Sequence, residues 1–453
     1  ELMFPQDFVD GLVLRLGKDR TEMLLSEMDG TPPVSIRLNP GKISSPDILS
    51  ELPVTDSSVA PTFSRYGYFL SSRPEFYLDP LFHAGAYYVQ EASSMYLESI
   101  ADVIAGMAHA SGDTFRVLDL CAAPGGKTTH LLSMLRDIPR SFLVSNEPVR
   151  KRAAVLCGNV SRWGEANVVV TNNDPADFRP LAEYFDLILV DAPCSGEGMF
   201  RKDSQARDEW SLDNVRLCAA RQRRIVSDIW GSLKPGGLLA YSTCTFNDLE
   251  NKENVNWISS VYKAAILDQT QFYPGESRAG EGFFFSLLRK NGEYGRLSSR
   301  RGNIRESGKD MYSRYGDIRI VRDGFRIFRK GDLLKAFPPE AGEDMRRLEG
   351  ILRVMQSGVS VARLKEGRGA DVLFLPEFSL IQSLAYRRGS LPEAELPLQS
   401  SISYLRRNTV AADGIPEGYV VFTYKGVPFG LGKNIGRRCN NLLPPSLAIR
   451  SQN

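Results

Sequence analysis

The chain has 453 residues, of which 42% are hydrophobic and 24% are charged, and a formal net charge of +2. This length suffices for about three domains of ~100–200 residues each, and the composition is that of an ordinary globular protein rather than a small disulfide scaffold. Because the charge is nearly balanced, it does not by itself indicate a nucleic-acid partner, and any basic surface has to be local.

The first domain that we expect, residues 1–90, alternates short helical and extended pieces. Apolar spacing between Pro5 and Met28 predicts two short helices. Residues 35–40 predict a short strand that stops at Pro40, because proline cannot donate a ladder hydrogen bond. We therefore expect an α/β extension ahead of the main domain.

The second expected domain, residues 91–290, consists of repeated strand-then-helix units. Short apolar runs predict five strands at residues 116–120, 142–145, 168–170, 185–190 and 238–241. A long helix is expected from about Asp208 to Trp230, and Gly236-Gly237 is expected to break the chain before the fifth strand. Strands that alternate with helices predict an α/β fold, in which a mostly parallel sheet is covered by helices on both faces.

The third expected segment, residues 291–370, holds a basic linker and a first C-terminal domain. Residues 289–330 contain 13 Lys or Arg and 5 Asp or Glu, a local net charge of +8. Five aromatic residues are interleaved with these charges: Tyr294, Tyr312, Tyr315, Phe325 and Phe328. A solvated linker and a strip that follows RNA phosphates while its aromatics stack on bases explain this pattern equally well.

The last expected domain, residues 371–453, is small and rich in β-structure. Residues 418–424 and 427–432 read as two strands, and Lys425-Gly426 between them is a hairpin signal. No apolar run in the chain approaches the ~18–20 residues of a membrane span, so we expect no membrane partner.

A Gly-rich turn after the first predicted strand is the first candidate ligand site. Residues 119–129 read Asp-Leu-Cys-Ala-Ala-Pro-Gly-Gly-Lys-Thr-Thr and lead from the strand into a helix. Glycine lets a ligand approach the backbone closely, and the helix start presents free N–H groups. A Walker loop needs an earlier glycine than this turn has, which disfavours hydrolysis of a nucleoside triphosphate. Taken alone, such a segment is more often just a tight turn.

Two carboxylates follow the next two predicted strands. Glu147 is placed to accept hydrogen bonds from ribose hydroxyls, and Asp174 is placed to meet an adenine. Taken alone, a surface carboxylate at a helix start is the more ordinary explanation of each. Because open α/β sheets bind ligands at the C-terminal ends of their strands, we expect the turn, Glu147 and Asp174 to line one site.

Two cysteines follow the fourth and fifth predicted strands. Cys194 lies in residues 191–200, and Cys244 lies in residues 242–245. One cysteine is usually just a small buried residue, but two on the loops after adjacent strands should face one crevice. Cys121 and Cys157 are expected to have structural thiols.

The remaining cysteines and histidines predict no metal centre. The six cysteines lack CxxC pairing, and none of the three histidines lies near a cysteine pair, so we expect no zinc site. The histidines also lack the context of a catalytic triad. Free thiols suit a reducing compartment, so we expect a cytoplasmic protein.

Together, these motifs resemble those of the Sun-type RNA cytosine-5 methyltransferases, and within them the F-type enzymes of small-subunit ribosomal RNA. The resemblance covers nearly the whole chain and is most specific at the Pro-Cys and Thr-Cys pairs. Weaker family motifs occur at residues 35–39, 88–95 and 280–284, and residues 418–443 resemble a PUA-like RNA-binding module. The resemblance implies a Rossmann-like class I methyltransferase sheet with an N-terminal α/β extension and a small β-rich PUA-like C-terminal domain.

The resemblance also implies the reaction, which is S-adenosyl-L-methionine-dependent methylation of carbon 5 of a cytosine in 16S RNA. Cys244 is implied as the nucleophile that attacks carbon 6, and Cys194 as the residue that helps to resolve the covalent adduct. Asp191 is expected to hold the base and to contact the cofactor, and Lys127 is expected to support either. The cofactor is expected to contact Cys121, Ala122, Ala123, Pro124, Gly125, Gly126, Lys127, Glu147, Asp174 and Asp191, all on loops of the catalytic domain.

The expected partner is small-subunit ribosomal RNA or the 30S subunit, and we expect the protein to act as a monomer. A transfer-RNA cytosine-5 methyltransferase would share every catalytic motif and is the alternative of the same class. The alternative of another class is a non-catalytic RNA-binding ribosome assembly factor, which the presence of both cysteines and the Gly-rich turn disfavours. A DNA cytosine methyltransferase would use the Pro-Cys cysteine and would not need the Thr-Cys motif.

Overall fold

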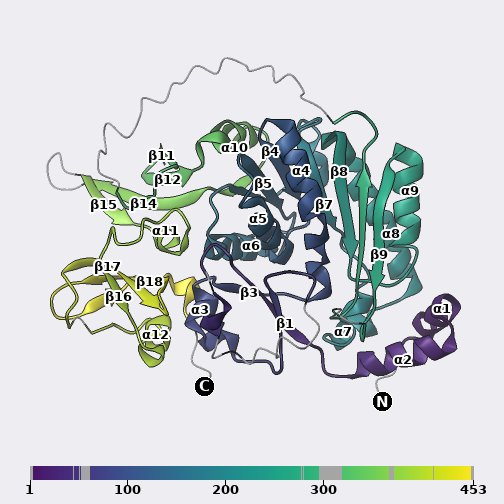
Figure 1. The fold of residues 1–453 in the computed structure, drawn as a ribbon, viewed down its shortest axis with the longest axis horizontal. Helices are drawn as coiled ribbons and strands as arrows, with labels where there is room; N and C mark the ends of the chain where they lie inside the picture. Colours follow the sequence, from purple (N-terminus) through teal and green to yellow (C-terminus); the bar gives the residue numbers. More distant parts are fainter. Residues whose placement is uncertain are drawn as a thin grey trace.

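A computed structural model describes residues 4–43, 45–49, 52, 62–276, 278, 280–294, 319–366, 372–411 and 413–449. The basic strip predicted at residues 289–330 falls largely outside these ranges, and so do Tyr312 and Tyr315. The described residues form four sheets, and the colours of Figure 1 follow the chain through them from purple to yellow. In the same residues, no helix is long and apolar enough to cross a membrane.

The N-terminal extension begins with the two expected helices, α1 (Gln6–Leu16) and α2 (Lys18–Asp29). Gly17, whose φ is +79°, turns the chain between them. The predicted strand is β1 (Val34–Leu38), the centre of a three-stranded antiparallel sheet with β2 (Gly67–Leu70) and β3 (Tyr87–Val89). Short helical pieces complete this region: η1 (Pro46–Leu49), η2 (Phe76–Leu78), α3 (Pro80–His83) and η3 (Ser93–Ile100).

The central sheet has eight strands in the order β13-β6-β5-β4-β7-β8-β10-β9. Its five middle strands are parallel and match the five predicted ones: β4 (Phe115–Asp119), β5 (Ser141–Asn146), β6 (Val168–Thr171), β7 (Phe185–Asp191) and β8 (Leu233–Thr243). The edges are antiparallel: β9 (Ala265–Phe272), β10 (Phe283–Arg289) and β13 (Val354–Ser357). The chain order reverses between β4 and β7, which creates a crevice at their C-terminal ends.

Helices cover both faces of this sheet, as the strand–helix alternation predicts. One face packs against α4 (Ala101–Ser111), α5 (Gly126–Leu135) and α6 (Arg150–Trp163). The other face packs against α8 (Leu212–Ile229), α9 (Lys252–Tyr262) and α10 (Gly342–Glu349). The sheet is therefore buried on both sides, which explains why its strands read as continuous apolar runs.

Two sequence-based boundaries in this domain are wrong. The helix expected from about Asp208 begins only at Leu212 as α8, because the Ser211 side chain caps it by accepting a hydrogen bond from the Asn214 N–H, and a separate short helix, α7 (Ser204–Asp208), ends at Asp208. Gly236 does not break the chain before the fifth strand, because β8 begins at Leu233 and accommodates a φ of +69° at this residue.

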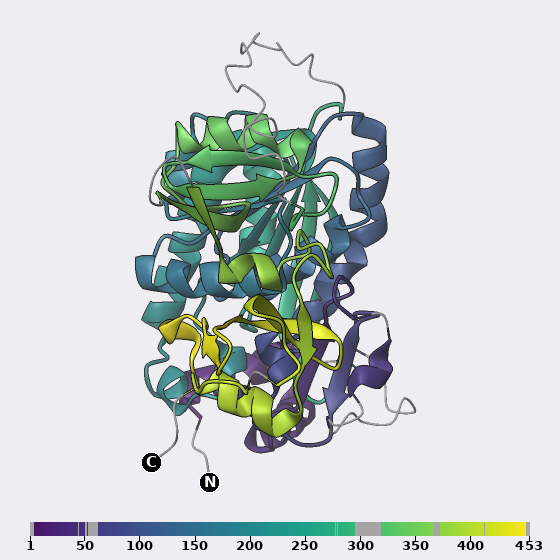
Figure 2. The same cartoon turned by 90° about the vertical axis from the view of Figure 1, so that its left-hand side faces the viewer.

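The C-terminal part contains two further sheets, which Figure 2 shows one above the other on the same side of the molecule. The first is antiparallel: β11 (Arg326–Lys330), β12 (Leu333–Phe337), β14 (Val359–Glu366) and β15 (Val372–Pro376). The second is the predicted β-rich domain: β16 (Glu393–Glu395), β17 (Gly418–Tyr424), β18 (Val427–Asn434) and β19 (Cys439–Asn441). The helices α11 (Phe378–Gln382) and α12 (Leu398–Leu405) accompany these sheets, and the hairpin turn is at Lys425 and Gly426, as predicted.

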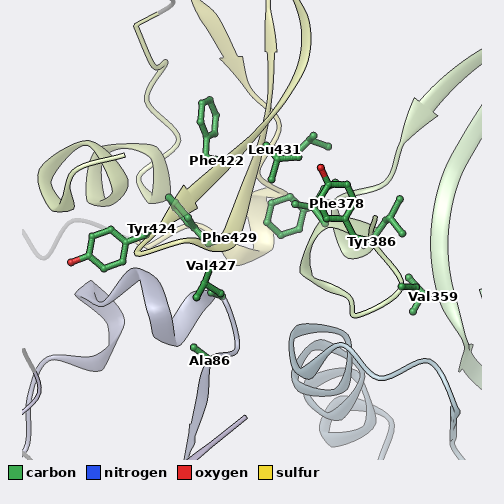
Figure 3. Close-up of a cluster of buried hydrophobic side chains, with 14 of the residues drawn as sticks. Ala86, Val359, Phe378, Tyr386, Phe422, Tyr424, Val427, Phe429 and Leu431 are labelled. Atoms are coloured by element: carbon green, nitrogen blue, oxygen red, sulfur yellow. The ribbon is translucent and has the colours of Figure 1, made fainter. Parts of the chain in front are cut away.

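A hydrophobic core joins the C-terminal sheets to the N-terminal extension. Figure 3 shows Val427 of β18 directed toward Ala86, which immediately precedes β3. A polar contact crosses the same junction, since the Gln382 side chain donates to the His83 carbonyl at 2.7 Å. Another reaches the central domain, where the Leu384 N–H donates at 2.9 Å to the carbonyl of Gly164 at the end of α6. The C-terminal sheets therefore pack directly against the rest of the molecule.

Candidate active site

The Gly-rich turn lies at the crevice between β4 and β7. It leaves β4 after Asp119 and enters α5 through Gly125, whose φ of +114° is a conformation that favours glycine. A Cβ atom on Gly125 would lie 3.2 Å from Leu156, so α6 closes this side of the turn. The backbone of residues 121–126 is consequently fixed between two helices.

Asparagine side chains connect the three loops that follow β4, β5 and β6. Asn146, at the end of β5, is fully buried and donates to the carbonyls of Leu120 at 3.1 Å and Asn173 at 3.0 Å. The Ala122 N–H donates back to the Asn146 carbonyl at 2.8 Å. The loops expected to bind one ligand are thus held at fixed relative positions, and Asn146 is a residue that the sequence analysis missed.

Asp119 retains an unsatisfied oxygen beneath the turn. Its Oδ2 accepts a hydrogen bond of 2.6 Å from the Thr128 hydroxyl, whereas Oδ1 is buried without a hydrogen-bond partner among the described residues. Burial raises the pKa of this carboxyl group to about 7. A buried acceptor that lacks a donor is costly, so a ligand or water that donates to it is favoured.

Glu147 is buried at the end of β5, with 1% of its surface exposed. One carboxylate oxygen accepts from the Val149 N–H at 3.0 Å, and the other lies 3.6 Å from the guanidinium of Arg152. Arg152 is half-exposed and also donates to the Ala123 carbonyl at 3.0 Å. Arg152 therefore contacts both the Glu147 carboxylate and the Gly-rich turn.

Asp174 has a local structural role. It caps η4 (Pro175–Phe178), and its Oδ1 accepts a hydrogen bond from the Ala176 N–H at 3.1 Å. It also forms an ion pair of 3.2 Å with Arg224, while about half of the side chain stays exposed. Asp174 thus has the role of a surface carboxylate that caps a helix start. Its position after β6 is also the one expected for a cofactor contact.

The two cysteines that follow β7 and β8 meet, with 3.2 Å between the sulfur atoms of Cys194 and Cys244. This agrees with the expectation that adjacent parallel strands bring them to one crevice. The pKa of Cys194 is raised well above its usual value by its hydrogen bond with Cys244, by burial and by the charge of Glu250. Cys194 therefore remains a thiol at neutral pH.

Lys127 and Asp191 form an ion pair beside the sulfur atoms. Their N–O distance is 2.9 Å, and the Ser242 hydroxyl donates to the second Asp191 oxygen at 2.7 Å. Burial alone would lower the pKa of Lys127, but the Asp191 carboxylate and the nearby Cys244 more than offset it, so this pKa is raised. Phe283 faces the ammonium group at 5.0 Å from its ring centre. Ser242 and Phe283 were within predicted family motifs, but their contacts were not foreseen.

Two buried carboxylates brace the cysteine loops. Glu250 accepts hydrogen bonds from the Ser195 N–H at 3.0 Å and from Gln222 at 2.7 Å. Glu197 accepts one from the Phe246 N–H at 2.7 Å. The Gly198 N–H also donates to the Cys244 carbonyl at 2.8 Å, and a Cβ atom there would lie 2.7 Å from that oxygen. These contacts join residues that lie far apart in the sequence, so no single sequence motif predicts them.

The other cysteines and histidines lie apart from this pair. The thiol of Cys121 packs against one core and that of Cys157 against another, and burial raises the pKa of both. His130 contacts Glu98 at 3.0 Å, and His83 contacts the Tyr77 carbonyl at 2.8 Å. In the described ranges, no group of three His, Cys, Asp or Glu side chains has the geometry to hold a metal ion.

Three family models match consecutive parts of the chain. The model of the 16S rRNA methyltransferase RsmB/F matches residues 107–289. The model of the N-terminal domain of 16S rRNA methyltransferase RsmF matches residues 4–92, and that of the methyltransferase RsmF PUA domain matches residues 392–449. These matches confirm the predicted fold class, including its C-terminal PUA domain.

Relatives and solved structures agree with these models. Ribosomal RNA small subunit methyltransferase F of Shewanella baltica is 30% identical and aligns over 98% of this chain and 96% of its own length. The enzyme of the same name from Shigella boydii is 31% identical over 80% of this chain and 78% of its own length. The crystal structure of NSun6 from Pyrococcus horikoshii with SFG, at 20% identity, has a TM-score of 0.53 and covers 64% of this chain and 100% of that one. This last likeness concerns the fold alone.

Proposed function

The chain belongs to the ribosomal RNA small subunit methyltransferase F family, and from this premise we propose that it methylates carbon 5 of a cytosine in small-subunit ribosomal RNA. We propose that it uses S-adenosyl-L-methionine and acts in the cytoplasm as a monomer. The observation that carries the proposal is the 3.2 Å approach of the Cys194 and Cys244 sulfur atoms beside the Lys127–Asp191 ion pair. This arrangement suits nucleophilic catalysis on a base that is turned out of its stack.

The residues at the crevice fit S-adenosylmethionine. Gly125 and Gly126 leave no side chain where the turn enters α5, and Oδ1 of Asp119, the last residue of β4, has no donor among the described residues. Glu147 ends the next strand, where a ribose would replace Arg152 as the partner of its carboxylate. Asp174 is proposed to contact the adenine. When bound, the cofactor supplies an electrophilic methyl group on a sulfonium.

In the proposed reaction, Cys244 attacks the cytosine as a thiolate. Its sulfur bonds to carbon 6, and the displaced π electrons make carbon 5 nucleophilic. Carbon 5 then takes the methyl group, whose bond to the sulfonium sulfur breaks and leaves a neutral thioether. Transfer of the carbon 5 proton to water then lets the bond from sulfur to carbon 6 break, which returns the Cys244 thiolate. The raised pKa of Lys127 keeps its ammonium group protonated near Cys244.

The remaining site residues have distinct proposed roles. Asp191, whose oxygens are oriented by Lys127 and Ser242, is placed to accept a hydrogen bond from the exocyclic amine of the base. Cys194 is proposed to help to resolve the adduct after methyl transfer, because its sulfur lies 3.2 Å from the attacking sulfur. Lys127 holds Asp191 in place and balances its charge.

The experiment that tests the proposal incubates Cys194→Ala, Cys244→Ala and the wild type with S-adenosylmethionine and 16S RNA. Cys194→Ala is expected to accumulate an RNA–protein complex that survives denaturing electrophoresis, and Cys244→Ala is expected to give neither complex nor methylation. Cys157→Ala, which changes a thiol on α6, serves as the control and should behave as the wild type. A complex with Cys244→Ala and none with Cys194→Ala would reverse the two roles.

The RNA class is tested in parallel. Bisulfite sequencing of total RNA from a strain that lacks the gene is expected to show loss of 5-methylcytosine from 16S RNA. Loss from transfer RNA alone would refute the ribosomal substrate, while unchanged methylation of every RNA would refute the enzymatic proposal.

A further inference from the structure

A segment outside the expected catalytic domain reaches the adenosine end of the proposed cofactor site. β13 pairs with β6 in the central sheet, with Val354 opposite Thr171. This pairing brings the residues just before β13 next to the loop that carries Asp174. The sequence analysis expected the cofactor site to come entirely from loops of residues 91–290, so this neighbour was not foreseen.

Hydrogen bonds connect this segment to the Asp174 loop. The Asn172 N–H donates to the Arg353 carbonyl at 3.0 Å, and the Arg353 N–H donates to the side-chain oxygen of Asn173 at 3.0 Å. Asn173 is in turn bonded to Asn146 through its own backbone, with its carbonyl accepting at 3.0 Å and its N–H donating at 3.1 Å. A chain of hydrogen bonds therefore runs from Arg353 to Asn146 and on to the Gly-rich turn.

The same segment forms one wall of a cavity of about 710 Å³. Asn172, Asn173 and Asp174 line one side of it, and Ile351 and Arg353 line another. Ile351 is 36% exposed, so the lining combines an apolar side chain with amide and carboxylate groups. A flat heterocycle with ring nitrogens and an exocyclic amine needs this combination of an apolar wall with hydrogen-bonding edges.

We propose that Ile351 and Arg353 complete the adenosine end of the cofactor site, with Ile351 as an apolar wall for the adenine and Arg353 as a positioning residue for the Asp174 loop. The inference rests on the proposed function, since it assigns the cavity to the adenine of that same cofactor. It follows that residues after 294 serve cofactor binding as well as any role in RNA binding. The central sheet without β13 would lack both the wall and the brace.

The test measures S-adenosylmethionine binding to the full chain by isothermal titration calorimetry. Ile351→Glu is expected to weaken binding about tenfold or more, because it places a charge against an apolar ring face. Met355→Glu is the matched control, since Met355 is 37% exposed on β13 and does not line the cavity; it should stay within about twofold of the wild type. Both positions are exposed, so both variants are expected to fold, which thermal unfolding without ligand verifies.

Two further measurements make the outcome decisive. Asn173→Ala keeps the backbone hydrogen bonds to Asn146 but removes the side-chain oxygen that accepts from the Arg353 N–H, and it is expected to weaken binding several-fold. Adenosine alone, used as a competitor, should lose affinity in Ile351→Glu by the same factor as the whole cofactor. Wild-type affinity in both Ile351→Glu and Asn173→Ala would overturn the inference, whereas a wild type that binds no cofactor would instead refute the proposed function.

Discussion

At the scale of single residues, burial shifts the pKa of ionisable side chains away from their ordinary values, and His130 is an example. His130 is 1% exposed, and its pKa is lowered to about 4 by burial and by the positive charge of Arg37, although Glu98 lies 3.0 Å away. Arg37, a residue of β1, is itself fully buried, and its guanidinium donates to Gly126 and Thr129 in the first turn of α5. The neutral imidazole is thus compatible with the buried cation.

A pH dependence of stability follows from His130. Its folded pKa lies below the unfolded value of about 6.5, so the unfolded state binds more protons between those two pH values. The free energy of unfolding therefore loses up to about 3 kcal/mol from this group as the pH falls from 6.5 to 4, at ~1.4 kcal/mol per pH unit. His130→Asn should flatten this loss in urea unfolding curves recorded at several pH values.

The matched control for this prediction is His109→Asn, because His109 is exposed on α4. It should leave the pH profile of unfolding unchanged. Profiles of His130→Asn and the wild type that run parallel from pH 7 to pH 4 would contradict the assignment of a buried neutral imidazole.

The sequence predicts some site residues well and others poorly, and the reason is local in each case. Cys194 and Cys244 each follow an apolar strand directly, so their meeting was predictable from the parallel sheet alone. Asp174 caps η4 only because of the backbone angles there. Glu250 braces the loop after β7 through Ser195, which lies 55 residues away in the chain. Neither relation leaves a pattern in the nearby sequence.

At the scale of elements, the two cysteine loops act as one unit. Glu250 is fully buried and joins the loop after β7 to α8 through the Ser195 N–H and the Gln222 side chain. Its pKa is raised by burial, which these hydrogen bonds oppose. The 3.2 Å between the sulfur atoms thus depends on an acidic side chain that touches neither of them.

Glu250→Ala is expected to reduce kcat on the order of a hundredfold, because a shift of about 1 Å in a reacting group has that effect. The affinity for S-adenosylmethionine should not change, since Glu250 lies on the cysteine side of the crevice. Glu250→Gln, which keeps an acceptor for the Ser195 N–H, should restore most of kcat. Steady-state kinetics with 16S RNA and calorimetry with the cofactor measure the two quantities.

Glu253→Ala provides the control, because Glu253 is an exposed carboxylate in the first turn of α9. A merely structural role for Glu250 would lower the melting temperature without lowering kcat in the folded protein. Such a result, or an equal loss of kcat in Glu253→Ala, would count against a positioning role.

The strands of the central sheet were predictable because a buried parallel strand is an unbroken apolar run. β13 was not, since Val354–Ser357 is a short mixed sequence that becomes a strand only by pairing with β6. The early start of β8 was hidden by Gly236, which reads as a breaker but sits inside the strand with φ of +69°. Tertiary pairing thus overrides local propensity at the edges of the sheet.

At the scale of the whole molecule, the modules are more closely joined than their separate sequence patterns indicate. One core contains Ile36 of β1, Leu334 of β12 and Phe429 of β18, all of which are less than 1% exposed. A local sequence pattern shows that each residue is buried but not which distant element buries it. The domain ranges expected from the sequence therefore describe the chain order better than they describe the packing.

Val427→Ala tests whether the PUA domain and the N-terminal extension are stabilised by each other. Val427 is 4% exposed and packs in the core that includes Ala86 (Figure 3), so removing its methyl groups should lower the free energy of unfolding by about 1–3 kcal/mol. Because the junction is shared, amide hydrogen exchange should become faster in β3 as well as in β17 and β18. Val149→Ala, at a residue that is 49% exposed, is the matched control and should change neither region. Faster exchange confined to β17 and β18 would mean that the PUA domain opens on its own, and the proposed mutual stabilisation would then be wrong.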